Sequence, residues 1–169
     1  MAERCVYLVR HGIAEDCSSS GEDFDRELTR RGVTQMETVA RGLATLGVEP
    51  RWILSSPYRR ARQTADILCA TLTHGGRKTW DELGCGVDED TLAARLAKLS
   101  PDGDILLVGH EPDMGELLSW FLTGRADVFS THFSKAAVAC IRAGMLPPMG
   151  RGRLEWFERA SVLERLALA

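Results

Sequence analysis

The stretch Cys5-Val6-Tyr7-Leu8-Val9-Arg10-His11-Gly12 sets the fold expected for this chain of 169 residues. Its first five residues form a continuous apolar run, which is typical of a strand buried on both faces of a sheet. An arginine, a histidine and a glycine follow this run directly. Because ligands of open α/β sheets bind outside the carboxyl ends of the strands, this order predicts a functional site at the end of the first strand.

Short apolar runs alternate with helical patterns along the rest of the chain. Further strands are predicted at residues 52–54, 77–80, 105–108, 136–142 and 154–157. The spacing of apolar residues predicts helices at residues 29–46, 58–72, 91–99 and 114–122, and a short helix or tail at 161–168. This alternation predicts an α/β fold, a three-layer sandwich with a mostly parallel central sheet. The length fits one domain that spans residues 1–169.

Composition excludes several classes of function. The formal net charge is −3, which argues against non-specific binding of nucleic acid. No apolar stretch approaches the length of a membrane span or a signal sequence, so no membrane association is expected. The five cysteines contain no Cys-x-x-Cys pair, which favours reduced thiols in a cytoplasmic protein. The four histidines lack the spacing of metal ligands, so neither a metal nor another cofactor is expected.

Three polar clusters each follow a predicted strand. Arg10-His11-Gly12 follows the first strand, Ser55-Ser56-Pro57 the second, and Gly109-His110 the strand at 105–108. If these strands are parallel, all three clusters lie at one edge of the sheet. The helix predicted after Pro57 brings three arginines to the same edge; they are Arg59, Arg60 and Arg62.

Two histidines and several arginines at one edge indicate phosphoryl chemistry. Guanidinium groups bind phosphate oxygens in a bidentate manner and stay charged. A helix N-terminus adds backbone donors for an anion. A neutral imidazole is a competent nucleophile, and phosphoryl transfer needs mainly positioning and charge stabilisation. The cluster therefore predicts a phosphoryl group that passes to and from an imidazole.

Four blocks of the sequence resemble the histidine phosphatase superfamily, which includes the cofactor-dependent phosphoglycerate mutases. They occur in the family's order between about Val6 and Phe121, and they are Leu8-Val9-Arg10-His11-Gly12, Leu28-Thr29-x-x-Gly32, Ser56-Pro57-Tyr58-Arg59-Arg60-Ala61-Arg62-Gln63-Thr64 and Val108-Gly109-His110. Within the superfamily the chain resembles most the small bacterial phosphohistidine phosphatases of the SixA type. The resemblance rests on the short chain and on the segments Gly109-His110-Glu111-Pro112-Asp113 and Glu82-Leu83. The segment between Thr64 and His110, where mutase-like members usually insert a helical lid, is also short.

The resemblance implies a role for each site residue. His11 is the expected nucleophile, Arg10 and Arg60 bind the phosphoryl oxygens, and His110 stabilises the charge on the transferring group. Glu82 is the nearest match to the glutamate that mutase-like members place beside the leaving group. The glycine-rich segment after Glu82 departs from that pattern, so its role as general acid stays open.

The expected function is a metal-independent phosphatase that works through a phosphohistidine on His11 and acts on phosphohistidine in a protein. Two alternatives stay open. The first is a phosphatase for a small phosphoester, with a mutase fitting the short chain less well. The second is a non-catalytic phosphate-binding module. The partner is then a phosphorylated protein or a small phosphoester, and nothing in the sequence indicates the oligomeric state. Ser55 and Ser56 are expected to be turn and helix-cap residues. The acidic segment 22–27 is expected to form a mobile loop at the rim of the site, and segment 130–135 is a candidate to border it.

Overall fold

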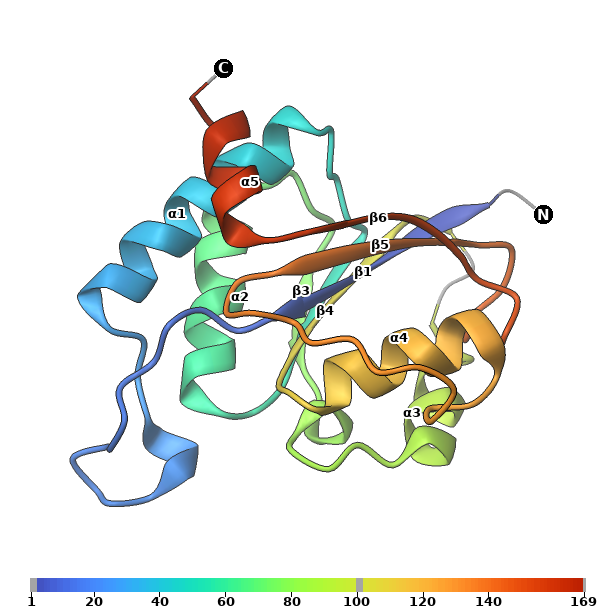
Figure 1. The fold of residues 1–169 in the computed structure, drawn as a ribbon, viewed down its shortest axis with the longest axis horizontal. Helices are drawn as coiled ribbons and strands as arrows, with labels where there is room; N and C mark the ends of the chain where they lie inside the picture. The colour runs from blue at the N-terminus through green and yellow to red at the C-terminus, as the bar shows by residue number, and fades with distance from the viewer. Residues whose placement is uncertain (1–2, 100–101, 169) are drawn as a thin grey trace.

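A six-stranded sheet forms the centre of the protein (Figure 1). The computed structural model describes residues 3–99 and 102–168. The strands lie in the order β3-β2-β4-β1-β5-β6. They are β1 (Arg4–Arg10), β2 (Trp52–Ser55), β3 (Arg77–Thr79), β4 (Ile105–Gly109), β5 (Val138–Ala143) and β6 (Arg153–Glu158).

Helices cover both faces of this sheet and make the three layers predicted from the sequence. The α-helices are α1 (Arg30–Thr45), α2 (Arg59–Thr71), α3 (Glu89–Leu96), α4 (Asp113–Thr123) and α5 (Ala160–Leu166). Figure 1 shows α1, α2 and α5 on one side of the sheet and α3 and α4 on the other. None of the helices in the described part of the chain has the length and apolarity needed to cross a membrane.

The position of strand β1 between two helical layers explains why its sequence is continuously apolar. Tyr7 and Val9 pack into a core beneath α1, α2 and α5, whereas Val6 and Leu8 pack into a second core beneath α3 and α4. Successive side chains of a strand point to opposite faces, so a strand between two helical layers needs apolar residues at every position. The prediction of a strand buried on both faces is therefore confirmed.

The half of the sheet that carries the site, formed by β3, β2, β4 and β1, is parallel. The pairs β1–β4, β2–β4 and β2–β3 are parallel, and the pairs β1–β5 and β5–β6 are antiparallel. The last two strands are joined by the loop 144–152, which is shorter than the crossover that a parallel pair needs. The mostly parallel sheet predicted from the alternation of elements is confirmed.

Most predicted elements are present with shifted ends, and two short 3-10 turns were not predicted. Helix α3 begins earlier than expected because the Asp88 carboxylate accepts a hydrogen bond of 2.7 Å from the Thr91 amide and caps the helix. The turn η1 (Asp23–Asp25) lies in the acidic segment that was expected to be a loop, and the turn η2 (Asp81–Leu83) contains Glu82. Both turns follow the carboxyl end of a strand of the parallel half.

Helix α1 is fixed against the chain that leaves β1. The Thr29 hydroxyl caps the helix by accepting a hydrogen bond of 3.0 Å from the Gly32 amide. A β-carbon at position 32 would lie only 2.0 Å from the carbonyl oxygen of Ile13. Only glycine allows the helix to approach this closely, which explains in physical terms why a glycine stands in this block.

Candidate active site

The register of the parallel strands brings the two histidines together. Arg10 pairs with Gly109 in the β1–β4 ladder, and the His11 amide donates a hydrogen bond of 3.0 Å to the Gly109 carbonyl. His110 follows directly, so the ring centroids of His11 and His110 lie 5.1 Å apart. The Ser56 amide extends the ladder on the other side by donating to the Val108 carbonyl. The convergence of three clusters at one sheet edge, predicted from periodicity, is confirmed.

His11 is buried and held in one tautomer. Its Nδ1 lies 2.7 Å from the carbonyl oxygen of Gly12. Because a carbonyl oxygen only accepts, Nδ1 carries the proton and Nε2 carries the lone pair. The pKa of His11 is lowered to about 2, mainly by burial and then by the positive charge of Lys135 and by His110. The ring is therefore neutral near pH 7 and presents an unprotonated Nε2.

Arg60 lies against that nitrogen. It is in the first turn of α2, only 4% exposed, and its Nε donates a hydrogen bond of 3.2 Å to His11 Nε2. The guanidinium carbon lies 4.8 Å from the centre of the Tyr58 ring. Thr64, one turn further along, accepts a hydrogen bond from the Gly12 amide and donates one to the Arg60 carbonyl. This buried hydroxyl ties the histidine segment to the helix that carries the arginine.

Arg10 supplies a second guanidinium at the same edge. Its Nη1 donates a hydrogen bond of 2.6 Å to the carbonyl oxygen of Phe133, in the segment before β5. Burial lowers the pKa of Arg10, and the charge of Arg60 lowers it further, while Glu111 opposes both. A buried guanidinium whose charge is disfavoured by a neighbouring guanidinium indicates a site that an anion would stabilise.

His110 is fixed by Ser56 and Tyr58. Its Nε2 lies 2.7 Å from the Ser56 hydroxyl, and its ring packs edge-on against the Tyr58 ring at 4.9 Å. Burial and then the charge of Arg60 lower the pKa of His110 to about 3. Among the described residues, its buried Nδ1 has no hydrogen-bond partner. A buried polar atom without a protein partner is available to form a hydrogen bond with a ligand oxygen.

Ser56 differs from its expected role. The helix cap of α2 is Tyr58, without a side-chain hydrogen bond, and the Ser56 hydroxyl instead accepts from the Tyr58 amide and bonds to His110. Ser55 is fully buried at the end of β2. Of the three arginines at the start of this helix, Arg59 and Arg62 are exposed, and Arg59 forms an ion pair with Glu27.

Glu82 lies in η2, where its carboxylate is 3.6 Å from Nη1 of Arg95. Within the described residues, no hydrogen bond or ion pair joins it to His11, Arg60 or His110. The structure therefore brings together four of the five expected site residues, and these are Arg10, His11, Arg60 and His110.

No group of three or more potential metal ligands occurs among residues 3–99 and 102–168.

Two charged residues of the site were not assigned from the sequence. Asp23 of η1 accepts hydrogen bonds from Arg60 through its carbonyl oxygen at 2.7 Å and through Oδ2 at 3.0 Å. The acidic segment thus lies at the rim of the site, as expected, but it is folded and bonded to an arginine. No motif marks Asp23, because its contact with Arg60 is set by the path of the chain between β1 and α1.

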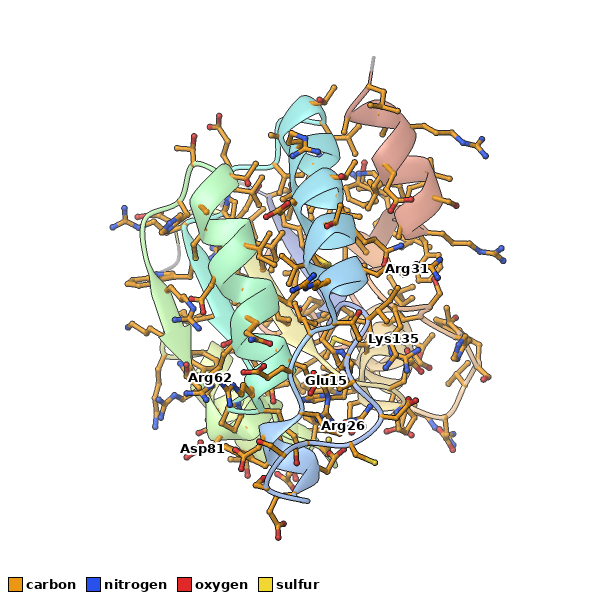
Figure 2. All side chains as sticks on the ribbon, turned by 90° about the vertical axis from the view of Figure 1, so that its left-hand side faces the viewer. Glu15, Arg26, Arg31, Arg62, Asp81 and Lys135 are labelled. Atoms are coloured by element: carbon orange, nitrogen blue, oxygen red, sulfur yellow. The ribbon has the colours of Figure 1, made fainter. Side chains whose placement is uncertain are left out.

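Lys135 is the second charged residue of the site that was not assigned from the sequence. Its neighbours bind the histidine segment, since the Ala136 amide donates to the His11 carbonyl and the Phe133 carbonyl accepts from Arg10. Burial first, and then the charges of Arg10, Arg26 and Arg60, lower the pKa of Lys135 to about 8. Figure 2 shows Lys135 and Arg26 on the same face of the molecule. Segment 130–135, which the sequence offers as a candidate, therefore borders the site.

Comparison with known proteins agrees with this geometry. The model of the Histidine phosphatase superfamily (branch 1) matches residues 6–97. An uncharacterised protein of Picosynechococcus sp. (strain ATCC 27264 / PCC 7002 / PR-6) is 38% identical over 82% of this chain and 85% of its own. Phosphohistidine phosphatase SixA of Escherichia coli (strain K12) is 28% identical over 89% of this chain and 91% of its own.

The solved structure of the protein histidine phosphatase SixA complexed with tungstate superimposes with a TM-score of 0.81 at 26% identity, covering 94% of this chain and 99% of that one. Its fold is the three-layer α/β fold described above. Together with the family match and the SixA relative, this likeness indicates a phosphatase. The chain belongs to the histidine phosphatase superfamily.

Proposed function

We propose that this phosphatase acts on phosphohistidine in a protein and forms a transient phosphohistidine on His11. One observation carries the proposal: a buried, neutral imidazole presents Nε2 within 3.2 Å of a buried guanidinium. The nucleophile and a group that binds phosphate oxygens are thus already side by side. Arg10, His110 and Lys135 surround them with positive charge and polar atoms.

The first step transfers the phosphoryl group to the enzyme. The phosphate oxygens bind Arg10 and Arg60, and Nδ1–H of His11 stays hydrogen-bonded to the Gly12 carbonyl. The lone pair of His11 Nε2 attacks phosphorus in line, a new P–N bond forms, and the P–N bond of the substrate breaks. The bonding pair goes to the substrate imidazole, which leaves as a neutral ring because its other nitrogen already carries a proton or the leaving nitrogen takes one up from solvent.

The second step returns the enzyme. A water oxygen attacks phosphorus, the P–Nε2 bond breaks, and its electron pair returns to His11 Nε2. The proton of the water leaves with phosphate or to solvent, so inorganic phosphate is released and the nucleophile is restored. Positive charge from the arginines stabilises the phosphoryl oxygens in both steps, which removes the need for a metal ion.

The environment of Glu82 supports phosphohistidine as the substrate. An alkoxide leaving group needs a general acid, whereas an imidazole can already carry its proton. Glu82 is paired with Arg95, and this pairing does not suit an acid held beside the reacting phosphate. Its assignment as general acid remains a prediction, which a Glu82→Gln variant tests. We expect hydrolysis of phosphohistidine to change only within a few-fold.

The proposal includes the partner and the compartment. The partner is a protein that carries phosphohistidine, and its side chain reaches a site without a large lid. We propose a cytoplasmic location, supported by the five cysteines, all of which are free thiols. We also propose that residues 1–169 act as one histidine phosphatase domain.

The test is release of phosphate from a phosphohistidine-carrying protein and from a panel of small phosphoesters, all with EDTA present. Wild type is compared with His11→Ala and with His74→Ala, which removes an exposed loop histidine as a matched control. We expect selective release from the protein, loss of activity in His11→Ala and full activity in His74→Ala. Efficient turnover of a small ester with little release from phosphohistidine would move the assignment to a small-molecule phosphatase. Activity that survives His11→Ala would refute the nucleophile.

A further inference from the structure

The acidic turn η1 occupies the phosphate-binding donors of Arg60. The guanidinium makes three bonds: Nε donates to His11, Nη1 to the Asp23 carbonyl and Nη2 to the Asp23 carboxylate. The two Nη groups are the fork that binds a carboxylate or a phosphate. A phosphoryl group placed on His11 Nε2 therefore meets an arginine whose fork is already occupied, Nη1 by a backbone carbonyl and Nη2 by a carboxylate of the same residue.

Asp23 is the partner that can move. Its side chain is 55% exposed, whereas that of Arg60 is 5% exposed and lies against Tyr58. The second carboxylate oxygen of Asp23 lies 2.7 Å from Nη1 of Arg26, so the carboxylate bridges two arginines. When Oδ2 leaves Arg60, Oδ1 can stay on Arg26, and the aspartate does not lose its charge partner.

The turn is also held by an aromatic contact. The rings of Phe24 and Tyr58 lie 5.0 Å apart, and Tyr58 in turn packs against His110. The hydrogen bond from Arg26 and then that from Arg60 hold the pKa of Asp23 below its usual range. The anion on Arg60 is therefore present at every pH at which the phosphatase would work.

We propose that Asp23 competes with the phosphoryl group for Arg60 and thereby selects substrates whose carrier contributes binding energy of its own. The inference rests on the proposed function, in which Arg60 binds the phosphoryl oxygens. A bare phosphate must displace Asp23 with only its contacts to the other groups of the site, such as Arg10 and His110, to offset the exchange. A phosphorylated protein brings contacts from its own surface, and after hydrolysis the remaining inorganic phosphate is expelled as Asp23 returns.

The test compares Asp23→Asn and Asp23→Ala with Asp25→Asn. Asp25 lies in the same turn, where it accepts a hydrogen bond from the Ser20 hydroxyl, and its replacement changes the net charge by the same amount. The readout is the dissociation constant of inorganic phosphate, measured by calorimetry at fixed ionic strength. We expect both Asp23 variants to bind phosphate roughly tenfold more tightly, since a hydrogen bond to a charged group is lost from the competing state. Asp25→Asn should bind like wild type.

Unchanged or weaker phosphate binding in both Asp23 variants would overturn the proposal, as would an equal gain in Asp25→Asn, which would reflect net charge alone. Thermal melting checks that each variant is folded. Equilibrium phosphate binding does not depend on turnover, so this result stands apart from the failure or success of the phosphohistidine assay. In kinetics, we expect Asp23→Asn to lower KM for a small phosphoester more than for a phosphorylated protein.

Discussion

Stability at mildly acidic pH should depend strongly on the two buried histidines. The native state keeps both rings neutral, with the pKa of His11 at about 2 and that of His110 at about 3. In the unfolded chain, each histidine takes up a proton below about pH 6.5. Below that pH the unfolded state binds more protons than the native state, so the free energy of unfolding falls as the pH falls.

The size of the loss follows from linkage. Between pH 6.5 and pH 5, each histidine crosses about 1.5 pH units, which corresponds to about 2 kcal/mol at 1.36 kcal/mol for each unit. Neither ring is protonated in the native state at pH 5, so the two contributions add to about 4 kcal/mol. For a domain of this size, that is a large share of a free energy of unfolding of about 5–15 kcal/mol.

Urea denaturation at pH 7 and pH 5 measures this effect in wild type and in the double variant His11→Asn, His110→Gln. The asparagine can keep the hydrogen bond to the Gly12 carbonyl, and the glutamine can keep the one to Ser56. We expect wild type to lose about 4 kcal/mol more than the double variant between the two pH values. An equal loss in both proteins would refute the reasoning. His74→Gln, on an exposed loop, controls for the removal of one histidine.

Three further predictions follow from particular contacts. Gly32→Ala should lose about 1–3 kcal/mol of stability in urea denaturation, because its new β-carbon would lie 2.0 Å from the Ile13 carbonyl oxygen; Gly144→Ala, with open space around it, should be nearly neutral. Thr64→Val should cost about 1–3 kcal/mol by leaving the Gly12 amide without its acceptor, whereas Thr45→Val, at an exposed helix end, should cost less than 1 kcal/mol. Phosphate binding should weaken above about pH 8 as Lys135 loses its charge beside Arg10 and Arg60, and Lys135→Arg should remove this pH dependence in a calorimetric titration. The same alkaline weakening in Lys135→Arg would exclude Lys135 as its cause.

The parallel half of the fold could be predicted because its residues obey simple periodic rules. A short continuous apolar run is typical of a strand covered on both faces. Arg10 and His11 follow one such run, and Gly109 and His110 follow another. The pairing of β1 with β4 then brings the two histidines together, and this convergence can be predicted without knowing how the side chains pack. The core of the site could be predicted for the same reason.

The contacts of the loops could not be predicted in this way. Asp23 and Lys135 come from segments without periodicity, and their distance to the site is set by turns such as η1. Ser56 was expected to cap a helix because serine often does, but its hydroxyl is taken up by the buried ring of His110. The motif predicts Glu82 only by its position, and the pairing of Glu82 with Arg95 depends on how α3 packs beside η2.

The register of β1 against β4 also makes the active site a product of long-range folding. Arg10 and Gly109 are neighbours in the ladder although most of the chain separates them, so no local segment can assemble the two histidines. A slip of one residue in this pairing would turn the side chains of β1 to the opposite faces and put each of them into the wrong one of the two cores. Contacts between such distant residues form late and slowly, because the intervening loop must close first. Recovery of activity during refolding would therefore report the completion of the central pair of strands.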